Sequence, residues 1–271
     1  MNRIPEPELM EDPAQAHAYA NADFSKPHSN FIRLFRESFP GDPITGNVID
    51  LGCGPGDIAI RFARAFPECV VHGVDGSQAM LDAGETLLAR CGDARNRVRL
   101  IPGMLPDADM PLSRYDIVIS NSLLHQLHEP QTLWTSVQKF AAPGAAVFIM
   151  DLRRPATLEE ARRLCDTYAG NEPPQLQRDY YNSLLAAFDP GEIAEQLAAA
   201  NLNQLVVHAI GDRHVTISGR MLYISSPGAL KSVFGAISAG GFAGSAGDSS
   251  GCSSWCQCFG ALPSHQAQFI G

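Results

Sequence analysis

Short apolar runs alternate with amphipathic segments through the middle of the chain. Runs in which nearly every residue is apolar are expected to be strands, at 48–51, 69–75, 97–101, 115–120 and 145–151. Helical spacing of apolar residues predicts helices between them, at 57–66, 77–90 and 130–140. Continuous apolar strands separated by helices are typical of a parallel sheet that is covered on both faces.

The flanking segments add helices and a hairpin. Apolar residues at helical spacing predict an amphipathic helix over 13–39, and three more helices at 157–169, 176–188 and 190–200. Two further apolar runs meet at Gly211–Asp212, a pair compatible with a tight hairpin turn. We therefore expect an α/β fold: a Rossmann-like, mostly parallel seven-stranded sheet with helices on both faces and an antiparallel C-terminal hairpin.

Three regions follow from these patterns. We expect an N-terminal helical cap over 1–40, a central domain over 41–220 with a helical insertion at 152–190, and a tail over 221–271. The tail is rich in Gly and Ser and has little periodicity, so it is expected to be disordered. A loose similarity of its Gly-Gly and Ser/Cys-rich stretch to a modified-peptide precursor is the minor alternative.

The net charge and the N-terminal sequence limit the kinds of partner that we expect. The formal net charge is −9 and the chain has no basic cluster for nucleic acid, and an acidic surface is repelled by anionic membranes. The N-terminal stretch MNRIPEPELMEDP lacks the apolar core of a signal peptide, and no apolar stretch is long enough for a spanning helix. We expect a cytoplasmic protein with a small-molecule partner, no nucleic acid and no membrane partner, and an oligomeric state that stays open.

The seven cysteines predict neither a disulfide framework nor a metal site. Four of them, Cys53, Cys69, Cys91 and Cys165, are scattered singly and are expected to be reduced thiols. The other three lie in the tail with a C-x3-C-x-C spacing, which is not a standard zinc pattern. No metal is predicted.

A glycine loop follows the first strand in the stretch VIDLGCGPGD. A strand that ends in a Gly-rich turn opening a helix is typical of a nucleotide-cofactor site. The glycines stand at Gly52, Gly54 and Gly56, whereas the dinucleotide fingerprint needs its third glycine where this chain has Asp57. Asp75 ends the next strand, where a carboxylate can accept hydrogen bonds from ribose hydroxyls.

Asp50 distinguishes between cofactors. A carboxylate at the mouth of the loop would repel a pyrophosphate by roughly a few kcal/mol. The same carboxylate would attract S-adenosylmethionine, which carries a sulfonium and an α-ammonium. Asp50 therefore favours S-adenosylmethionine, and with Asp57 it disfavours an NAD-dependent oxidoreductase. A buried aspartate that only binds backbone N–H groups is the structural alternative.

The stretches VIDLGCGPGD, HGVDGSQAMLDAG and YDIVISNSLLHQL resemble the three leading motifs of class I S-adenosylmethionine-dependent methyltransferases of the small-molecule type. The resemblance implies that Gly52, Gly54 and Gly56 wrap the methionine and adenosine parts of the cofactor. It implies that Asp50 lies near the cofactor's amino end and that Asp75 binds the ribose hydroxyls.

The resemblance also implies two further cofactor contacts, and at a third position the chain departs from the family pattern. Met80 corresponds to the apolar residue near the adenine, and Asn121 lines the pocket near the methionine moiety. Members of the family often have an acid after the third strand that contacts adenine. This chain departs from that pattern, because Met104 stands there as the candidate for cofactor contact, and the departure leaves adenine recognition to backbone groups or to Leu105.

Two histidines are the candidates for a catalytic role. His125 and His128 follow the fourth predicted strand at a spacing of three, and either could act as a general base near neutral pH. The alternative is that one packs in the core and the other caps the next helix. Asp151 ends the fifth strand, where a functional and a capping role are both open.

The acceptor would need a cover over the cofactor methyl group. The predicted helix at 176–188 carries Arg178 and Tyr181 beside other polar groups, so both are candidate substrate residues. The N-terminal segment could form the other half of the cover, with Tyr19, Phe24 and His28 as candidates. Both segments could instead present solvated polar faces.

We therefore expect an S-adenosylmethionine-dependent methyltransferase that moves the sulfonium methyl to a small-molecule acceptor by in-line displacement. The alternative is a non-catalytic S-adenosylmethionine-binding module with an interaction tail. Transfer of the methyl group to any acceptor distinguishes the two.

Overall fold

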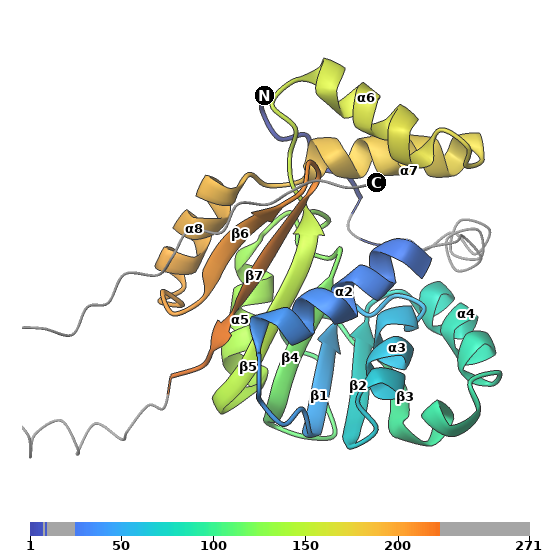
Figure 1. Cartoon of the computed structure of the whole chain (residues 1–271), viewed down its shortest axis with the longest axis vertical. Coiled ribbons are helices and arrows are strands. Elements are labelled where there is room, and N and C mark those ends of the chain that lie inside the picture. Colours follow the sequence, from blue (N-terminus) through green and yellow to red (C-terminus); the bar gives the residue numbers. More distant parts are fainter. Residues whose placement is uncertain (8, 10–24, 223–271) are drawn as a thin grey trace, which may run out of the picture. The chain divides into compact units, whose positions relative to one another are not determined.

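A seven-stranded sheet forms the centre of the protein in the computed structural model, which describes residues 1–7, 9 and 25–222. Its strand order is β3-β2-β1-β4-β5-β7-β6. The strands are β1 (Gly46–Leu51), β2 (Cys69–Asp75), β3 (Val98–Pro102), β4 (Tyr115–Asn121), β5 (Ala141–Leu152), β6 (Val206–Ile210) and β7 (His214–Arg220). The first five are mutually parallel, whereas β7 runs antiparallel to β5 and β6 (Figure 1). The fold predicted from the sequence is confirmed.

One strand is longer than its apolar pattern indicates. Strand β5 begins at Ala141, four residues before the predicted start. Pro143 and Gly144 interrupt the apolar run there, yet Ala141 pairs with Tyr115 across a register shift between Tyr115 and Ile117. Tertiary pairing therefore extends a strand through residues of poor strand propensity.

The helices lie close to their predicted positions. They are α2 (Ser25–Ser38), α3 (Asp57–Ala65), α4 (Gln78–Leu88), the 3-10 helix η1 (Gly92–Arg97), α5 (Gln131–Phe140), α6 (Leu158–Ala169), α7 (Pro174–Ala186) and α8 (Pro190–Ala199). Local caps explain several starts: the Ser77 hydroxyl accepts a hydrogen bond from Met80 N, and Asp189 and Glu192 form a capping box. The 3-10 helix has no apolar periodicity, and the sequence did not predict it.

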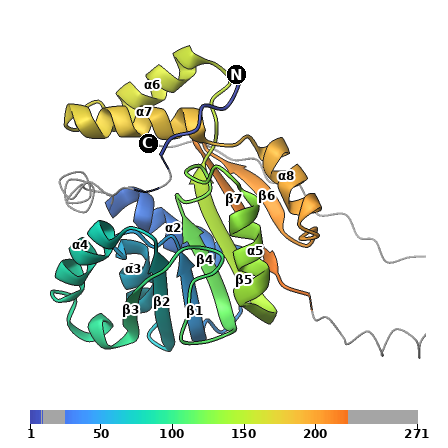
Figure 2. The same cartoon turned by 180° about the vertical axis from the view of Figure 1, so that it is seen from behind.

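Helices cover both faces of the sheet (Figures 1 and 2). On one face, α2 and α3 pack an aromatic core in which the Phe35 ring lies 4.8 Å from Phe62 and 5.7 Å from Phe148, each edge to face. On the other face, α5 and α8 bury a second core that includes Trp134 and Ile193. This two-layered cover is what the continuous apolar strands predicted.

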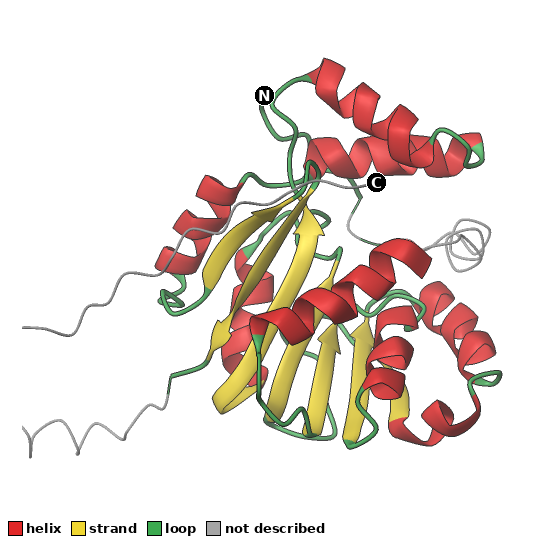
Figure 3. Ribbon diagram, in the orientation of Figure 1, coloured by secondary structure: helices red, strands yellow, loops and turns green. Residues whose placement is uncertain are grey.

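Helices α6 and α7 belong to the predicted insertion at 152–190 and lie at the carboxyl end of the sheet (Figure 3). They form a small core of their own with the end of β5, through Leu152, Leu164, Leu184 and Ala187. Because parallel strands end at the same edge, the loops after β1, β2, β4 and β5 lie along the carboxyl edge of the sheet. Any ligand of the sheet is expected at this edge.

No helix in the described part of the chain combines the length and apolar character needed to cross a bilayer. Residues 1–224 group as one compact unit. The predicted tail lies outside the described residues from position 223 onward, and so does the predicted helical stretch at 13–24.

Candidate cofactor and acceptor site

The glycine loop has a backbone that other residues rarely adopt. Gly52, Gly54 and Gly56 have φ angles of +68°, +52° and +76°. A Cβ on Gly54 would meet no atom within 4 Å, so open space lies beside the loop at that point. At Gly52, in contrast, a Cβ would lie 2.6 Å from the side chain of Leu123. The loop therefore leaves room for a ligand at Gly54 and is closely covered at Gly52.

Asp75 shapes this loop from the end of β2. Its Oδ2 accepts a hydrogen bond of 2.8 Å from Gly54 N, and its Oδ1 accepts one of 2.8 Å from Ser77 N. Burial raises the pKa of the Asp75 carboxyl, although the hydrogen bonds from Ser77 and Gly54 oppose that rise. Each carboxylate oxygen keeps a further lone pair for a ligand donor.

Two buried oxygens at the ends of adjacent strands have no hydrogen-bond donor among the described residues. They are Oδ2 of Asp50 on β1 and Oδ1 of Asn121 on β4. Buried acceptors are normally satisfied, so each such atom needs an explanation. Burial, then the nearby charge of Asp75, raises the pKa of Asp50 well above its usual range, while a hydrogen bond from the Ala59 amide opposes this. Acceptors without donors suit a ligand that brings N–H groups and positive charge.

The loop after β3 lies beside the end of β2. A Cβ on Gly76 would lie 2.6 Å from the Met104 sulfur and 3.0 Å from Cδ2 of Leu9. Met104 is 55% exposed, which is unusual for a large apolar side chain and suits a flat apolar ligand. Met80 is buried in the first turn of α4. The structure therefore groups Met104 and Leu9 next to Asp75.

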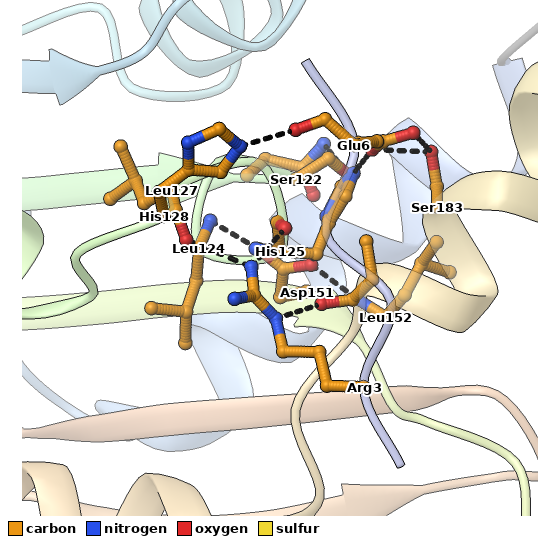
Figure 4. Close-up of polar contacts among 12 residues, drawn as sticks. Arg3, Glu6, Ser122, Leu124, His125, Leu127, His128, Asp151, Leu152 and Ser183 are labelled. Carbon is orange, nitrogen blue, oxygen red and sulfur yellow. Dashed lines mark hydrogen bonds and ion pairs between the residues drawn. The ribbon is translucent and has the colours of Figure 1, made fainter. Parts of the chain in front are cut away.

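A cluster of charged groups lies on the other side of the sheet edge, around His125 (Figure 4). The ring Nδ1 of His125 lies 2.5 Å from Oδ1 of Asp151, and its Nε2 lies 3.3 Å from Oε1 of Glu6. Asp151 also accepts hydrogen bonds from the amides of Leu124 and Leu152, at 2.7 and 2.6 Å. Because Asp151 faces only donors, it is an acceptor that fixes the imidazole with Nδ1 protonated.

The N-terminal segment completes this cluster. Arg3 donates hydrogen bonds to the carbonyls of Ala186, His125 and Leu127, at 2.6, 2.9 and 2.8 Å. Its guanidinium also lies 4.1 Å from the ring centroid of Phe188. The sequence gives no signal for Arg3 and Glu6, because an isolated Arg and Glu in a Pro-rich N-terminus show no pattern until tertiary structure places them.

The other candidates occupy varied positions. His128 is exposed, and its Nε2 donates to the carbonyl of Glu6 at 2.8 Å. Arg178 is exposed and bonds Gln175 one turn earlier on α7. Tyr181 is half-buried on the same helix. Whether Arg178 and Tyr181 contact a substrate stays a prediction.

Of the three N-terminal candidates, the structure describes one. His28 is buried, and its Nδ1 lies 2.5 Å from Oδ2 of Asp57, so it joins α2 to the first turn of α3. Tyr19 and Phe24 lie outside the described residues. Within the described ranges no group of three or more His, Cys, Asp or Glu residues could hold a metal ion.

Comparison with known proteins agrees with this geometry. Residues 49–147 match the family model described as a methyltransferase domain. An uncharacterized methyltransferase of Schizosaccharomyces pombe is 30% identical over 107 residues, which are 38% of this chain and 38% of the relative. A trans-aconitate 2-methyltransferase of Methylobacterium radiotolerans is 32% identical over 128 residues, or 46% of this chain and 44% of the relative. The matches thus span less than half of these curated relatives.

Solved structures share the fold. A SAM-dependent methyltransferase from Aquifex aeolicus superimposes with a TM-score of 0.57 at 15% identity, over 78% of this chain and 99% of that one. The plantazolicin methyltransferase BpumL, in complex with a substrate analogue and SAH, gives a TM-score of 0.56 at 11% identity, over 77% and 90% of the chains. At this identity the likeness concerns the fold alone.

The doubly wound sheet, the glycine loop and the acidic residue after β2 define a Rossmann-like domain that binds a nucleoside cofactor. Residues 49–147 match a methyltransferase domain, and the fold around them is the one seen in S-adenosylmethionine-dependent methyltransferases. These matches support the methyltransferase family and the cofactor that the sequence predicted. The orphaned acceptors Asp50 and Asn121 and the open space at Gly54 fit this cationic, phosphate-free cofactor.

Proposed function

We propose that this protein transfers a methyl group from S-adenosylmethionine to a small-molecule acceptor. The observation that supports the cofactor in this proposal is the pair of buried oxygens at the ends of β1 and β4, Asp50 Oδ2 and Asn121 Oδ1, which have no hydrogen-bond donor among the described residues. Support for a small acceptor comes from the acidic net charge of −9 and from relatives named for trans-aconitate and plantazolicin. A cytoplasmic location is part of the proposal.

Different residues of the chain would bind different parts of the cofactor. S-adenosylmethionine, when bound, supplies an electrophilic methyl group on a sulfonium. Asp50 and Asn121 would accept N–H groups from its amino end, and Asp75 would accept its ribose hydroxyls. Met80 and Met104 would supply apolar contact for its base, and the loop from Gly52 to Gly56 would let the backbone approach closely.

His125 would serve as the proton acceptor when the nucleophile must lose a proton. Asp151 holds Nδ1, so Nε2 is the ring nitrogen that can take the proton from the acceptor atom. Burial by itself lowers the pKa of His125, but Asp151 and Glu6 more than offset this, and the pKa is raised. Turnover should therefore rise with pH through a pKa above the usual histidine value. His128, which is exposed, is the second candidate for this role.

Two measurements test the proposal. Calorimetry on wild type and Asp75→Ala should show S-adenosylmethionine binding that weakens about tenfold or more in the variant, because a charge-assisted hydrogen bond is worth roughly 1.5–3 kcal/mol. Thermal melting of both proteins separates lost binding from lost folding. Tight NADH binding without S-adenosylmethionine binding would overturn the proposal.

Catalysis needs its own test. Labelled S-adenosylmethionine, incubated with the protein and fractions of small metabolites, should leave label in a product other than the cofactor. Cofactor binding with no transfer to any fraction would favour the alternative, a non-catalytic S-adenosylmethionine-binding module.

A further inference from the structure

The N-terminal strap, defined here as residues 1–7, crosses the carboxyl end of the sheet between α7 and the loop after β4 (Figure 4). It is anchored along its length. The terminal amine of Met1 donates to the carbonyl of Ala156 at 3.1 Å, and Ile4 N donates to the carbonyl of Leu185 at 3.0 Å. Together with the bonds of Arg3, these contacts fix the backbone on both sides of Glu6.

Glu6 points its carboxylate into the protein. The Ser183 hydroxyl donates to Oε1 of Glu6 at 3.0 Å, and the same oxygen lies 3.3 Å from Nε2 of His125. The exposed fractions of the side chains rise from 2% at Asp151 through 4% at His125 to 14% at Glu6. The three groups thus form a row that leads outward from the end of β5, with the imidazole between two carboxylates.

A buried carboxylate needs a reason. Burial raises the pKa of Glu6, and His125 and Ser183 oppose that rise. The charged groups facing His125 are Asp151 from β5 and Glu6 and Arg3 from the strap, while Asp179 on α7 acts on Glu6. A carboxylate placed here costs desolvation energy, and its imidazole contact is the compensation. The Glu6 carboxylate contacts Nε2, the ring nitrogen of His125 that Asp151 does not bind.

We propose that Glu6 is a positioning residue of the acceptor site, which holds the imidazole of His125 from the side opposite Asp151. This rests on the proposed methyl transfer. When the acceptor atom forms its bond to the methyl carbon, the bond from that carbon to the sulfonium sulfur would break, and its electron pair would leave with S-adenosylhomocysteine. The proton of the acceptor atom would move to Nε2 of His125, and the resulting imidazolium would lie between the carboxylates of Asp151 and Glu6. Glu6 therefore stabilises the protonated ring without contacting the acceptor.

Glu6→Gln tests this role, because it keeps the shape of the side chain and removes its charge. Glu129→Gln is the matched control, since Glu129 is exposed on the loop before α5. Imidazole titration by NMR, with the His125 signal assigned through His125→Asn, gives a readout that needs no cofactor. In Glu6→Gln the pKa of His125 should fall by about one unit, as expected for loss of an opposite charge at this distance.

Kinetics should change in a way that a structural role would not produce. In a plot of turnover against pH, the acidic limb should move to lower pH by about one unit, as the pKa of His125 does. Maximal turnover should fall about tenfold. The dissociation constant of S-adenosylmethionine should stay within about twofold, and Glu6→Asp should restore part of the pH profile. Glu129→Gln should match wild type in every measurement.

Two results would overturn the inference: an unchanged His125 titration in Glu6→Gln, or a joint loss of melting temperature and cofactor affinity. Failure of the proposed function looks different, because then the wild type itself would bind no S-adenosylmethionine. The titration would still report whether Glu6 controls His125.

Discussion

The two halves of the sheet edge are built in different ways. On the β1–β2 side, the glycine loop, Asp50 and Asp75 lie within 26 residues of one another, counted from 50 to 75. On the β4–β5 side, Glu6, His125 and Ser183 meet although they are 119 and 58 residues apart along the chain, counted from 6 to 125 and from 125 to 183. Local sequence therefore specifies the β1–β2 side, called the cofactor half here, and tertiary contact assembles the β4–β5 side, which is the proposed acceptor half.

The chemistry differs as well. In the cofactor half, Oδ2 of Asp50 has no hydrogen-bond donor among the described residues, as is also the case for Oδ1 of Asn121 at the adjoining end of β4, and such acceptors suit a cationic ligand. The acceptor half is internally satisfied, with each charged group facing an opposite charge or a donor. If the comparison is right, a substitution in one half should leave the function of the other half nearly unchanged.

Asp151→Asn should produce the largest effect. An amide in place of this carboxylate cannot accept bonds from both the His125 ring and the backbone amides of Leu124 and Leu152. Turnover should fall by about a hundredfold or more, in the range of general acid–base contributions. Cofactor affinity should change by less than about twofold in calorimetry, because these contacts lie outside the cofactor half.

Asp116→Asn, at the exposed amino end of β4, is the control for the same chemical change. A loss of cofactor affinity in Asp151→Asn as large as the loss of turnover would break the comparison between the halves.

Asp50→Asn should weaken S-adenosylmethionine binding by about tenfold to a hundredfold, since a charged hydrogen bond contributes roughly 1.5–3 kcal/mol. The free energy of unfolding should stay equal or rise, because the amide removes a carboxyl that is buried beside the like charge of Asp75 and whose Oδ2 has no donor among the described residues. The affinity of the wild type for S-adenosylmethionine should decrease as the pH is lowered, because Asp50 becomes protonated at its raised pKa. The variant should lack this pH dependence. Calorimetry across pH and denaturant unfolding measure both. Joint loss of stability and affinity would instead assign Asp50 the role of holding the Ala59 amide.

Gly84→Ala should disturb the cofactor half through packing. A Cβ there would lie 2.7 Å from the carbonyl oxygen of Pro55, so α4 would have to move away from the glycine loop. We expect the free energy of unfolding to fall by about 1–3 kcal/mol, as is typical of overpacking, and the cofactor to bind several-fold more weakly. Gly191→Ala in α8 is the matched control, since its new Cβ meets only a side-chain oxygen at 3.1 Å. Equal melting temperatures for Gly84→Ala and wild type would contradict the close packing.

His128→Ala should have the smallest effect. Its ring is exposed and donates a hydrogen bond to the Glu6 carbonyl. Turnover should change less than about twofold, because an exposed hydrogen bond contributes roughly 0.5 kcal/mol. A loss beyond tenfold would transfer the proton-accepting role from His125 to His128.

The sequence alone determined the fold and the cofactor. Strand and helix periods are local, and the glycine loop with Asp50 and Asp75 uses residues that one strand–turn–helix and the next strand bring together. That is why all seven strands were predicted, and why S-adenosylmethionine was favoured before any contact was known.

Only the tertiary structure decided which groups surround His125. The sequence offered His125 and His128 equally, and it offered no signal for Glu6 or Arg3. Folding buried one histidine between Asp151 and Glu6 and left the other exposed. The physical reason is that burial and charge pairing depend on segments far apart in the chain, whose approach no local period encodes.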